Sequence, residues 1–247
     1  MVSPSVAGRP RQWFDEGHCV GTGPYTIASH EPGQRLIMDR FDGYRRGWQE
    51  KQIETIVFQI VNDPVVASQL MEAGEADFWR DAPPDRIESL SALESLEVYV
   101  QPAFQNMIFM LNTRKTPLND PRVRQALAYS YPYDDFRQRT AGIHSQARGA
   151  IPVGVWGHGQ DLYQYTYDPD KARELLAEAG YAEGSFELEV TYTSSVPVSA
   201  WAVELWAFPL REQGIALKPR AMTFEALWER AKSDPAKAQD IAVFGCW

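Results

Sequence analysis

The stretch Gly21-Thr22-Gly23-Pro24-Tyr25 joins a glycine turn to an extended segment, and Leu118-Asn119-Asp120-Pro121-Arg122-Val123-Arg124-Gln125-Ala126-Leu127 begins a capped amphipathic helix. Glycine supplies the backbone freedom that a tight turn needs. Asp-Pro is typical of a helix start, because aspartate caps the first amides and proline fits the first turn. A strand-rich beginning followed by capped helices predicts an α/β fold.

The residues around the first stretch predict a sheet. Turn residues Glu31-Pro32-Gly33-Gln34 separate the extended segments Tyr25–Ala28 and Arg35–Asp39, which predicts a hairpin. The β-branched run Ile53–Val61 predicts a long strand. A helix is expected from Pro64 to Gly74, capped by Asp63, with one apolar face formed by Val66, Leu70 and Ala73. A second helix is expected over Pro84–Leu93, and strands over Leu96–Val100 and Met107–Leu111.

The second half alternates strands and helices, which favours an α/β layer fold. Asp120-Pro121 and Asp168-Pro169 begin two helices, and Gly180 ends the second. Further expected elements are strands over Phe186–Thr191, from Leu217, and over Ile241–Phe244, and helices over Ser199–Gln213 and Phe224–Ala231. Core packing is expected for Trp201, Leu205, Phe208 and Trp228. A change in composition predicts a domain boundary near Leu111–Asn112.

Composition excludes several classes of protein. The 247 residues carry a net charge of −9, which argues against a nucleic-acid partner. No apolar run approaches the roughly 18–20 residues that cross a bilayer, and Met1–Gly17 has no apolar core of a secretory signal. Cys19 and Cys246 are expected as two unpaired thiols, although a bridge is possible on count alone.

No residue pattern indicates catalysis, a metal site or a cofactor. Glu187 and Glu189 share one strand face, where a solvated role is expected. Gly21-Thr22-Gly23 lacks the third glycine of a dinucleotide fingerprint, since Thr26 stands there, and no Gly-x-Ser-x-Gly occurs. No two histidines have metal-site spacing; they are His18, His30, His144 and His158.

Five segments in this order resemble the family 5 bacterial extracellular solute-binding proteins, the peptide-capturing components of ABC-type uptake transporters. They are Val20–Tyr25, Leu70–Asp77, Phe109–Thr113, Asn119–Leu127 and Tyr167–Tyr181, and Phe244–Trp247 is similar to the start of the family's strand ending in Gly-Trp. The resemblance covers almost the whole chain. It departs at Tyr131-Pro132-Tyr133-Asp134, where many members have a plainer aliphatic stretch, and at Phe244, where some peptide binders carry a cation.

The resemblance implies a two-lobe periplasmic-binding-protein-like fold of the class II type, truncated at both ends. Residues 1–111 would be the middle segment of the first lobe and residues 112–247 most of the second, with a hinge at Leu111 and Asn112. It also implies a non-catalytic monomer in the periplasm or outside the cell, with or without a membrane anchor, that closes around its ligand and meets a membrane-embedded permease. The export signal would lie outside this chain.

The ligand implied by the resemblance is a di- or oligopeptide. Aromatic walls and polar groups near strand ends suit such a ligand; the candidates are Phe104, Gln105, Asn106, Ser194, Ser195, Phe224 and Trp247. A nickel complex, haem, an oligosaccharide or an opine is the alternative within the family, and a truncated remnant that binds nothing is another. A hydrolase is disfavoured, because neither a nucleophile with its base nor a spaced carboxylate pair is present.

Overall fold

Residues 4–16, 18, 20–80, 82–101, 103–182 and 186–246 are described by a computed structural model. The chain divides into two compact units, Met1–Leu70 and Met71–Trp247, and the division falls inside helix α2 (Pro64–Glu72). Among the described residues, none of the helices has the length and apolar character to cross a membrane.

The first unit is built on a three-stranded antiparallel sheet in the order β1-β2-β3. Its elements are η1 (Pro4–Val6), α1 (Arg11–Asp15), β1 (Tyr25–Glu31), β2 (Arg35–Arg40) and β3 (Thr55–Gln59). The predicted hairpin is confirmed, and Gly33 takes the positive φ of 75° that its turn requires. β3 is shorter than predicted, because its partner β2 offers only five paired positions, from Arg35 to Asp39.

The two helices that follow begin as the sequence predicts. The Asp63 carboxylate accepts a 2.8 Å hydrogen bond from the Val65 amide at the start of α2, and Gly74 has a φ of 70° just after its end. α3 covers Pro84–Ser91. The predicted apolar face of α2 is not its most buried face, since Val66 is 43% exposed whereas Ala67 is buried. The predicted strand over residues 96–100 is also wrong, because this segment forms no ladder.

The second unit is built on a four-stranded mixed sheet in the order β4-β7-β5-β6. Its strands are β4 (Asn106–Leu111), β5 (Phe186–Thr193), β6 (Ile215–Met222) and β7 (Ile241–Cys246). β5 runs parallel to both β6 and β7, whereas β4 is antiparallel to β7. Its helices after α3 are α4 (Pro121–Tyr129), α5 (Tyr133–Arg139), α6 (Pro169–Glu178), α7 (Pro197–Glu212) and α8 (Phe224–Ala231).

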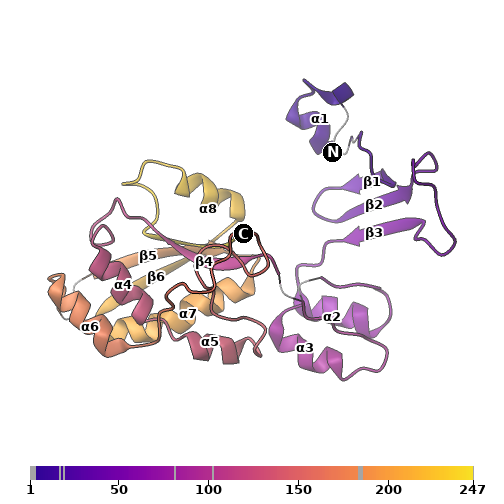
Figure 1. Ribbon diagram of the computed structural model, residues 1–247. Helices are drawn as coiled ribbons and strands as arrows, with labels where there is room; N and C mark the ends of the chain where they lie inside the picture. The colour runs from indigo at the N-terminus through magenta and orange to yellow at the C-terminus, as the bar shows by residue number, and fades with distance from the viewer. Residues whose placement is uncertain are drawn as a thin grey trace. The chain divides into compact units, whose positions relative to one another are not determined.

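The sheet of the second unit is covered on both faces, which confirms the α/β class. Figure 1 shows α8 on one face and α4, α6 and α7 on the other. The larger core joins Val123 and Leu127 of α4 to Leu188 and Val190 of β5. A smaller core under α8 contains Leu227, Ala242 and Phe244. Alternation along β7 explains the two cores, because Ile241 and Val243 face one side and Ala242 and Phe244 the other.

Two aspartates cap helices on the larger core, as the Asp-Pro pairs predict. The Asp120 carboxylate accepts from the Arg122 amide at 2.8 Å, and the Asp168 carboxylate accepts from the Lys171 amide at 2.9 Å. The Arg122 side chain also donates to Asp120 and holds the pKa of that carboxyl below its usual value. Each cap satisfies an amide that the first helical turn leaves without a partner.

The buried face of α7 differs from the prediction. Trp206 is 3% exposed and packs edge-on against the Phe109 ring, with the centroids 4.9 Å apart. Phe208 is 60% exposed, and Trp201 is only partly buried, with the Arg139 guanidinium over its ring. The core prediction is therefore wrong for Phe208, whereas Leu205 is partly buried and packs against the larger core. α7 meets the sheet mainly through the neighbouring stripe, which contains Trp206 and Leu210.

Two tyrosines give the second unit a pH-dependent stability. A 2.6 Å hydrogen bond to the Tyr163 hydroxyl raises the pKa of Tyr129 to about 12, and burial raises the pKa of Tyr133 to about 12. Tyrosine in the unfolded chain ionises near pH 10. Both groups therefore stabilise the fold fully below about pH 10, and this stabilisation is lost as the pH rises toward about 12.

We expect ultraviolet difference absorbance to show part of the tyrosine titration above about pH 11 in the folded protein. Tyr133→Phe should reduce the fall in melting temperature between about pH 10 and 12. A folded protein whose eleven tyrosines all ionise together near pH 10 would contradict this assignment.

Candidate functional site

At one edge of the four-stranded sheet lie the residues that directly follow β5, β6 and β7 and those that directly precede β4. The parallel strands β5, β6 and β7 all end there, and the antiparallel strand β4 begins there. The register pairs Thr193 with Met222 and Asn106 with Cys246. In open α/β sheets, ligands bind outside the carboxyl ends of the strands. This edge, here named the carboxyl edge, is the candidate binding site.

Ser194 and Ser195 lie at the carboxyl edge directly after β5. The Ser194 amide donates a 2.8 Å hydrogen bond to the Met222 carbonyl, which extends the pairing of β5 and β6 by one position. Both serine side chains are exposed. They therefore present hydroxyls and main-chain groups at the edge, where an extended ligand could form hydrogen bonds.

Phe224 begins α8 immediately after β6, so it also lies at the carboxyl edge. The Thr223 hydroxyl caps the helix by accepting from the Ala226 amide at 3.3 Å. Phe224 is 51% exposed and meets the buried Phe244 ring at a centroid distance of 6.4 Å. Trp228, one turn further along α8, meets the same ring at 5.5 Å.

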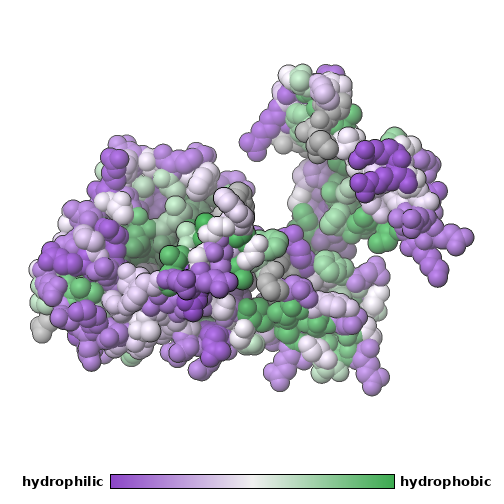
Figure 2. Space-filling model, viewed as in Figure 1, coloured by the Kyte–Doolittle hydropathy of each residue, from purple (hydrophilic) through white to green (hydrophobic). Residues whose placement is uncertain are grey.

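Trp228 is an aromatic residue of this surface that sequence reasoning placed in the core. Its side chain is 43% exposed, so the core prediction is wrong. Its spacing of four residues from Phe224 would have indicated that the two rings share a helix face. In Figure 2, apolar atoms gather beneath α8 and beside β4, and others gather over α2 and α3.

Phe104, Gln105 and Asn106 approach the carboxyl edge from the start of β4. The Asn106 amide donates to the carbonyls of Gly149 and Ala150, at 3.3 and 3.2 Å. Gln105 is exposed, and Phe104 is 61% exposed. Asn106 therefore holds a neighbouring loop against the edge, and a direct contact of these three residues with a ligand stays a prediction.

The remaining predicted residues lie elsewhere. Trp247 and Cys19 are outside the described residues. Leu111 pairs with Ile241 at the opposite edge of the sheet. Beside it, the Asn112 amide side chain donates to the carbonyls of Pro235 and Gln239 at 2.9 and 3.3 Å. The predicted hinge and lobe boundary at Leu111 and Asn112 stay predictions.

Several charged groups lie at or near this opposite edge. Asp240 pairs with the Lys115 ammonium at 2.6 Å and accepts from the Glu189 amide at 2.8 Å. The Glu189 carboxylate receives both arms of the Arg230 guanidinium. Glu189 is thus paired and three-quarters buried rather than solvated, whereas Glu187 pairs with Lys218 on the exposed surface. The Glu187 pair joins β5 to β6, and the Glu189–Arg230 pair joins β5 to α8.

The two histidines of the second unit also serve the fold. Burial lowers the pKa of His144, whose ring packs against Phe136. The His158 ring nitrogen Nδ1 lies 2.8 Å from the Ile151 carbonyl. Within the described residues, no group of three His, Cys, Asp or Glu side chains is placed to hold a metal ion.

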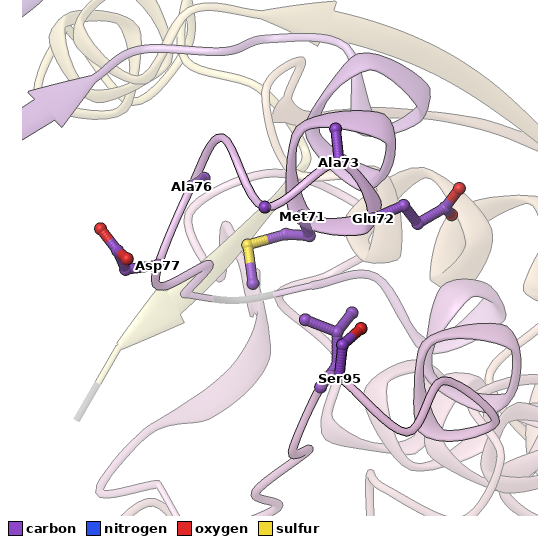
Figure 3. Close-up of a pocket in the computed structure, with 8 residues that line it drawn as sticks. Met71, Glu72, Ala73, Ala76, Asp77 and Ser95 are labelled. Carbon is purple, nitrogen blue, oxygen red and sulfur yellow. The ribbon is translucent and has the colours of Figure 1, made fainter.

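A surface pocket of about 440 Å³ lies at the end of α2, away from these groups. It is lined by Met71, Glu72, Ala73, Gly74, Ala76, Asp77, Ser95 and Leu96. Figure 3 shows the Met71 thioether pointing into the space above Ser95, while the carboxylates of Glu72 and Asp77 point away from each other. Because its polar groups do not converge, this pocket is a weaker candidate than the carboxyl edge.

Comparisons with known proteins agree with this architecture. Residues 2–245 match the family described as Bacterial extracellular solute-binding proteins, family 5 Middle. The Dipeptide-binding protein of Escherichia coli strain K12 is 31% identical over 194 residues, which cover 78% of this chain and 33% of that protein.

Two solved structures show the fold. The Helicobacter pylori periplasmic binding protein DppA, in complex with peptide STSA, has a TM-score of 0.85 at 22% identity, over 100% of this chain and 48% of its own. NikA from Brucella suis, in complex with Fe(III)-EDTA, has a TM-score of 0.78 at 22% identity, over 92% of this chain and 48% of its own. The chain thus spans about a third to a half of these proteins and has the α/β fold of periplasmic binding proteins.

Proposed function

The chain belongs to the bacterial extracellular solute-binding proteins of family 5, and from this membership we propose that it contributes the binding surface of a substrate-binding component of an ABC-type uptake transporter. The proposed ligand is a di- or oligopeptide. The family consists of binding proteins rather than enzymes, so the ligand would be released unchanged to a membrane-embedded permease. A periplasmic or extracellular location follows from the same membership.

The observation that carries the proposal is the carboxyl edge itself. Ser194, Phe224 and Asn106 come from segments far apart in the sequence, yet the strand register places all three at one end of the sheet. Main-chain groups and hydroxyls there can form hydrogen bonds with a peptide backbone whatever the side chains of the peptide are. The exposed aromatic rings offer contact area at a low cost in side-chain entropy.

Closure around the hinge at Leu111 and Asn112 is part of the proposal. A ligand that contacts both lobes favours the closed state by its difference in affinity for the two states. The closed form would then be the one that the permease binds.

We expect a dipeptide mixture to stabilise the 247-residue chain. A ligand at one hundred times its Kd adds about 2.7 kcal/mol to the free energy of unfolding, which raises the melting temperature of a chain of this size by about 5–10 °C. Differential scanning calorimetry measures this shift, and titration calorimetry then gives the Kd for single dipeptides. A broad transition unaffected by any peptide would favour a remnant that binds nothing.

Phe224→Ala tests whether the carboxyl edge is the place of binding. Loss of an exposed aromatic contact should weaken dipeptide affinity about tenfold with little change in the melting temperature of the unliganded protein. Phe208→Ala is the matched control, because Phe208 is an exposed phenylalanine on α7 at 60% exposure. Equal affinities for the two variants would place the peptide elsewhere.

A non-peptide solute is the second candidate, and the similarity to NikA in complex with Fe(III)-EDTA favours it. A melting temperature raised by a metal chelate but not by any dipeptide would replace the peptide assignment. The binding role and the use of the carboxyl edge would then stand, with a different ligand.

A further inference from the structure

The loop over residues 149–159, here named the tryptophan loop, presents an unusually exposed aromatic side chain. Trp156 is 97% exposed, and Val153 and Ile151 in the same loop are 57% and 40% exposed. Large apolar side chains that gather in water, rather than occur singly, mark a surface that something else contacts. We therefore expect the exposed apolar side chains of this loop to contact another molecule.

Hydrogen bonds fix the tryptophan loop beside the carboxyl edge. The Asn106 side chain at the start of β4 donates to the carbonyls of Gly149 and Ala150. Across the loop, the His158 ring nitrogen Nδ1 lies 2.8 Å from the Ile151 carbonyl. At its base, the Arg148 guanidinium donates to the Gln160 carbonyl at 3.1 Å.

Close packing connects the tryptophan loop to a predicted ligand residue. A Cβ atom added at Gly154 would lie 2.6 Å from the Phe104 ring, so that ring rests directly on the loop backbone. Gly154 also has a φ of 85°, which disfavours any side chain at this position. The apolar surface of the loop is therefore continuous with Phe104, which is itself 61% exposed.

The residue types of the tryptophan loop favour an apolar or aromatic group as its binding partner. Residues 149–159 contain no Asp, Glu, Lys or Arg, so this loop carries no permanent charge that would pair with a charged end of a ligand. A flat indole ring in an uncharged, braced loop is suited to an apolar or aromatic side chain. A rigid aromatic residue also contributes contact area with little loss of side-chain entropy on binding.

We propose that Trp156 is a specificity-determining contact for an apolar or aromatic side chain of the bound peptide, while the strand ends hold the peptide backbone. This inference rests on the proposed function, because it assigns a substrate preference to the same site. It predicts that the protein binds peptides with an aromatic residue more tightly than those built only from alanine.

The test compares two dipeptides, Ala-Phe and Ala-Ala, by titration calorimetry on the full 247-residue chain. Trp156→Ala should weaken Ala-Phe binding about tenfold and change Ala-Ala binding by less than about twofold. Trp156→Phe should restore most of the Ala-Phe affinity, and Phe208→Ala on α7 should leave both affinities unchanged.

The possible results separate this inference from the proposed function. If Trp156→Ala binds both dipeptides as the wild type does, or loses both equally, the preference is not set by Trp156, and the peptide-binding function stands. If the wild type binds neither dipeptide, the proposed function fails and the inference fails with it. A dimer in sedimentation that Trp156→Ala dissociates would assign the surface to a second copy of the chain and overturn the inference.

Discussion

Trp206→Ala is expected to lower the free energy of unfolding by about 3–5 kcal/mol. Trp206 is 3% exposed and lies among the rings of Phe109 and Tyr131, at centroid distances of 4.9 and 5.8 Å. Alanine would leave a cavity between α7 and β4 that these rings cannot fill without leaving their present packing. Chemical denaturation followed by circular dichroism measures the loss.

Phe208→Ala is the matched control for this change. It removes a large ring from the same helix, but Phe208 is 60% exposed, so the cost should be under about 1 kcal/mol. If the two variants were equally stable, the assignment of the buried face of α7 would be wrong.

Asp240→Ala is expected to cost about 2–4 kcal/mol. Asp240 is the residue just before β7, and its carboxylate joins the Lys115 ammonium at 2.6 Å to the Glu189 amide at 2.8 Å. The Lys115 and Asp240 side chains are 28% and 17% exposed. Removal of the carboxylate would leave the Glu189 amide without this acceptor and the partly buried Lys115 ammonium without its counter-charge, while Lys115 would keep its 3.0 Å hydrogen bond to the Ala238 carbonyl.

Two further variants show how much of this cost comes from the lost charge and how much depends on the burial of the ion pair. Asp240→Asn keeps an oxygen for the Glu189 amide and loses only the charge, so it should cost less than Asp240→Ala. Glu187→Ala removes an exposed cross-strand pair with Lys218 and should cost under about 1 kcal/mol. An Asp240→Ala protein as stable as Glu187→Ala would show that this contact does not hold β7 to its neighbours.

Local chemistry made most elements of the fold predictable. Asp120 and Asp168 cap α4 and α6 as expected, and α8 covers the predicted residues Phe224–Ala231. α5 was not predicted; it spans only seven residues, Tyr133–Arg139, and begins after Pro132 with no side-chain cap.

The orientation of elements was less predictable than their position. α7 carries two apolar stripes, one through Trp201 and Phe208 and the other through Trp206 and Leu210. Helical periodicity permits either stripe to face inward, and only the position of the sheet selects the second.

The candidate site was predictable where it follows directly from strands. Ser194 and Phe224 come immediately after β5 and β6, and parallel pairing then places them at one edge. The exposure of Trp228 and Trp156 depends on which neighbours pack against them, and no local pattern specifies this. Sequence reasoning therefore named candidate residues that follow strands and missed the exposure of Trp228 and Trp156.

The position of β7 between β4 and β5 has a consequence for synthesis on the ribosome. Ile241 pairs with both Leu111 and Val190, so β4 lacks its neighbour until about 130 further residues have been translated. At roughly 5–20 residues per second this interval is about 7–26 s. During that time the nascent polypeptide exposes unpaired strand edges, which favour aggregation. We therefore expect chaperone depletion to reduce the soluble yield of newly made protein more strongly than it affects protein that has already folded.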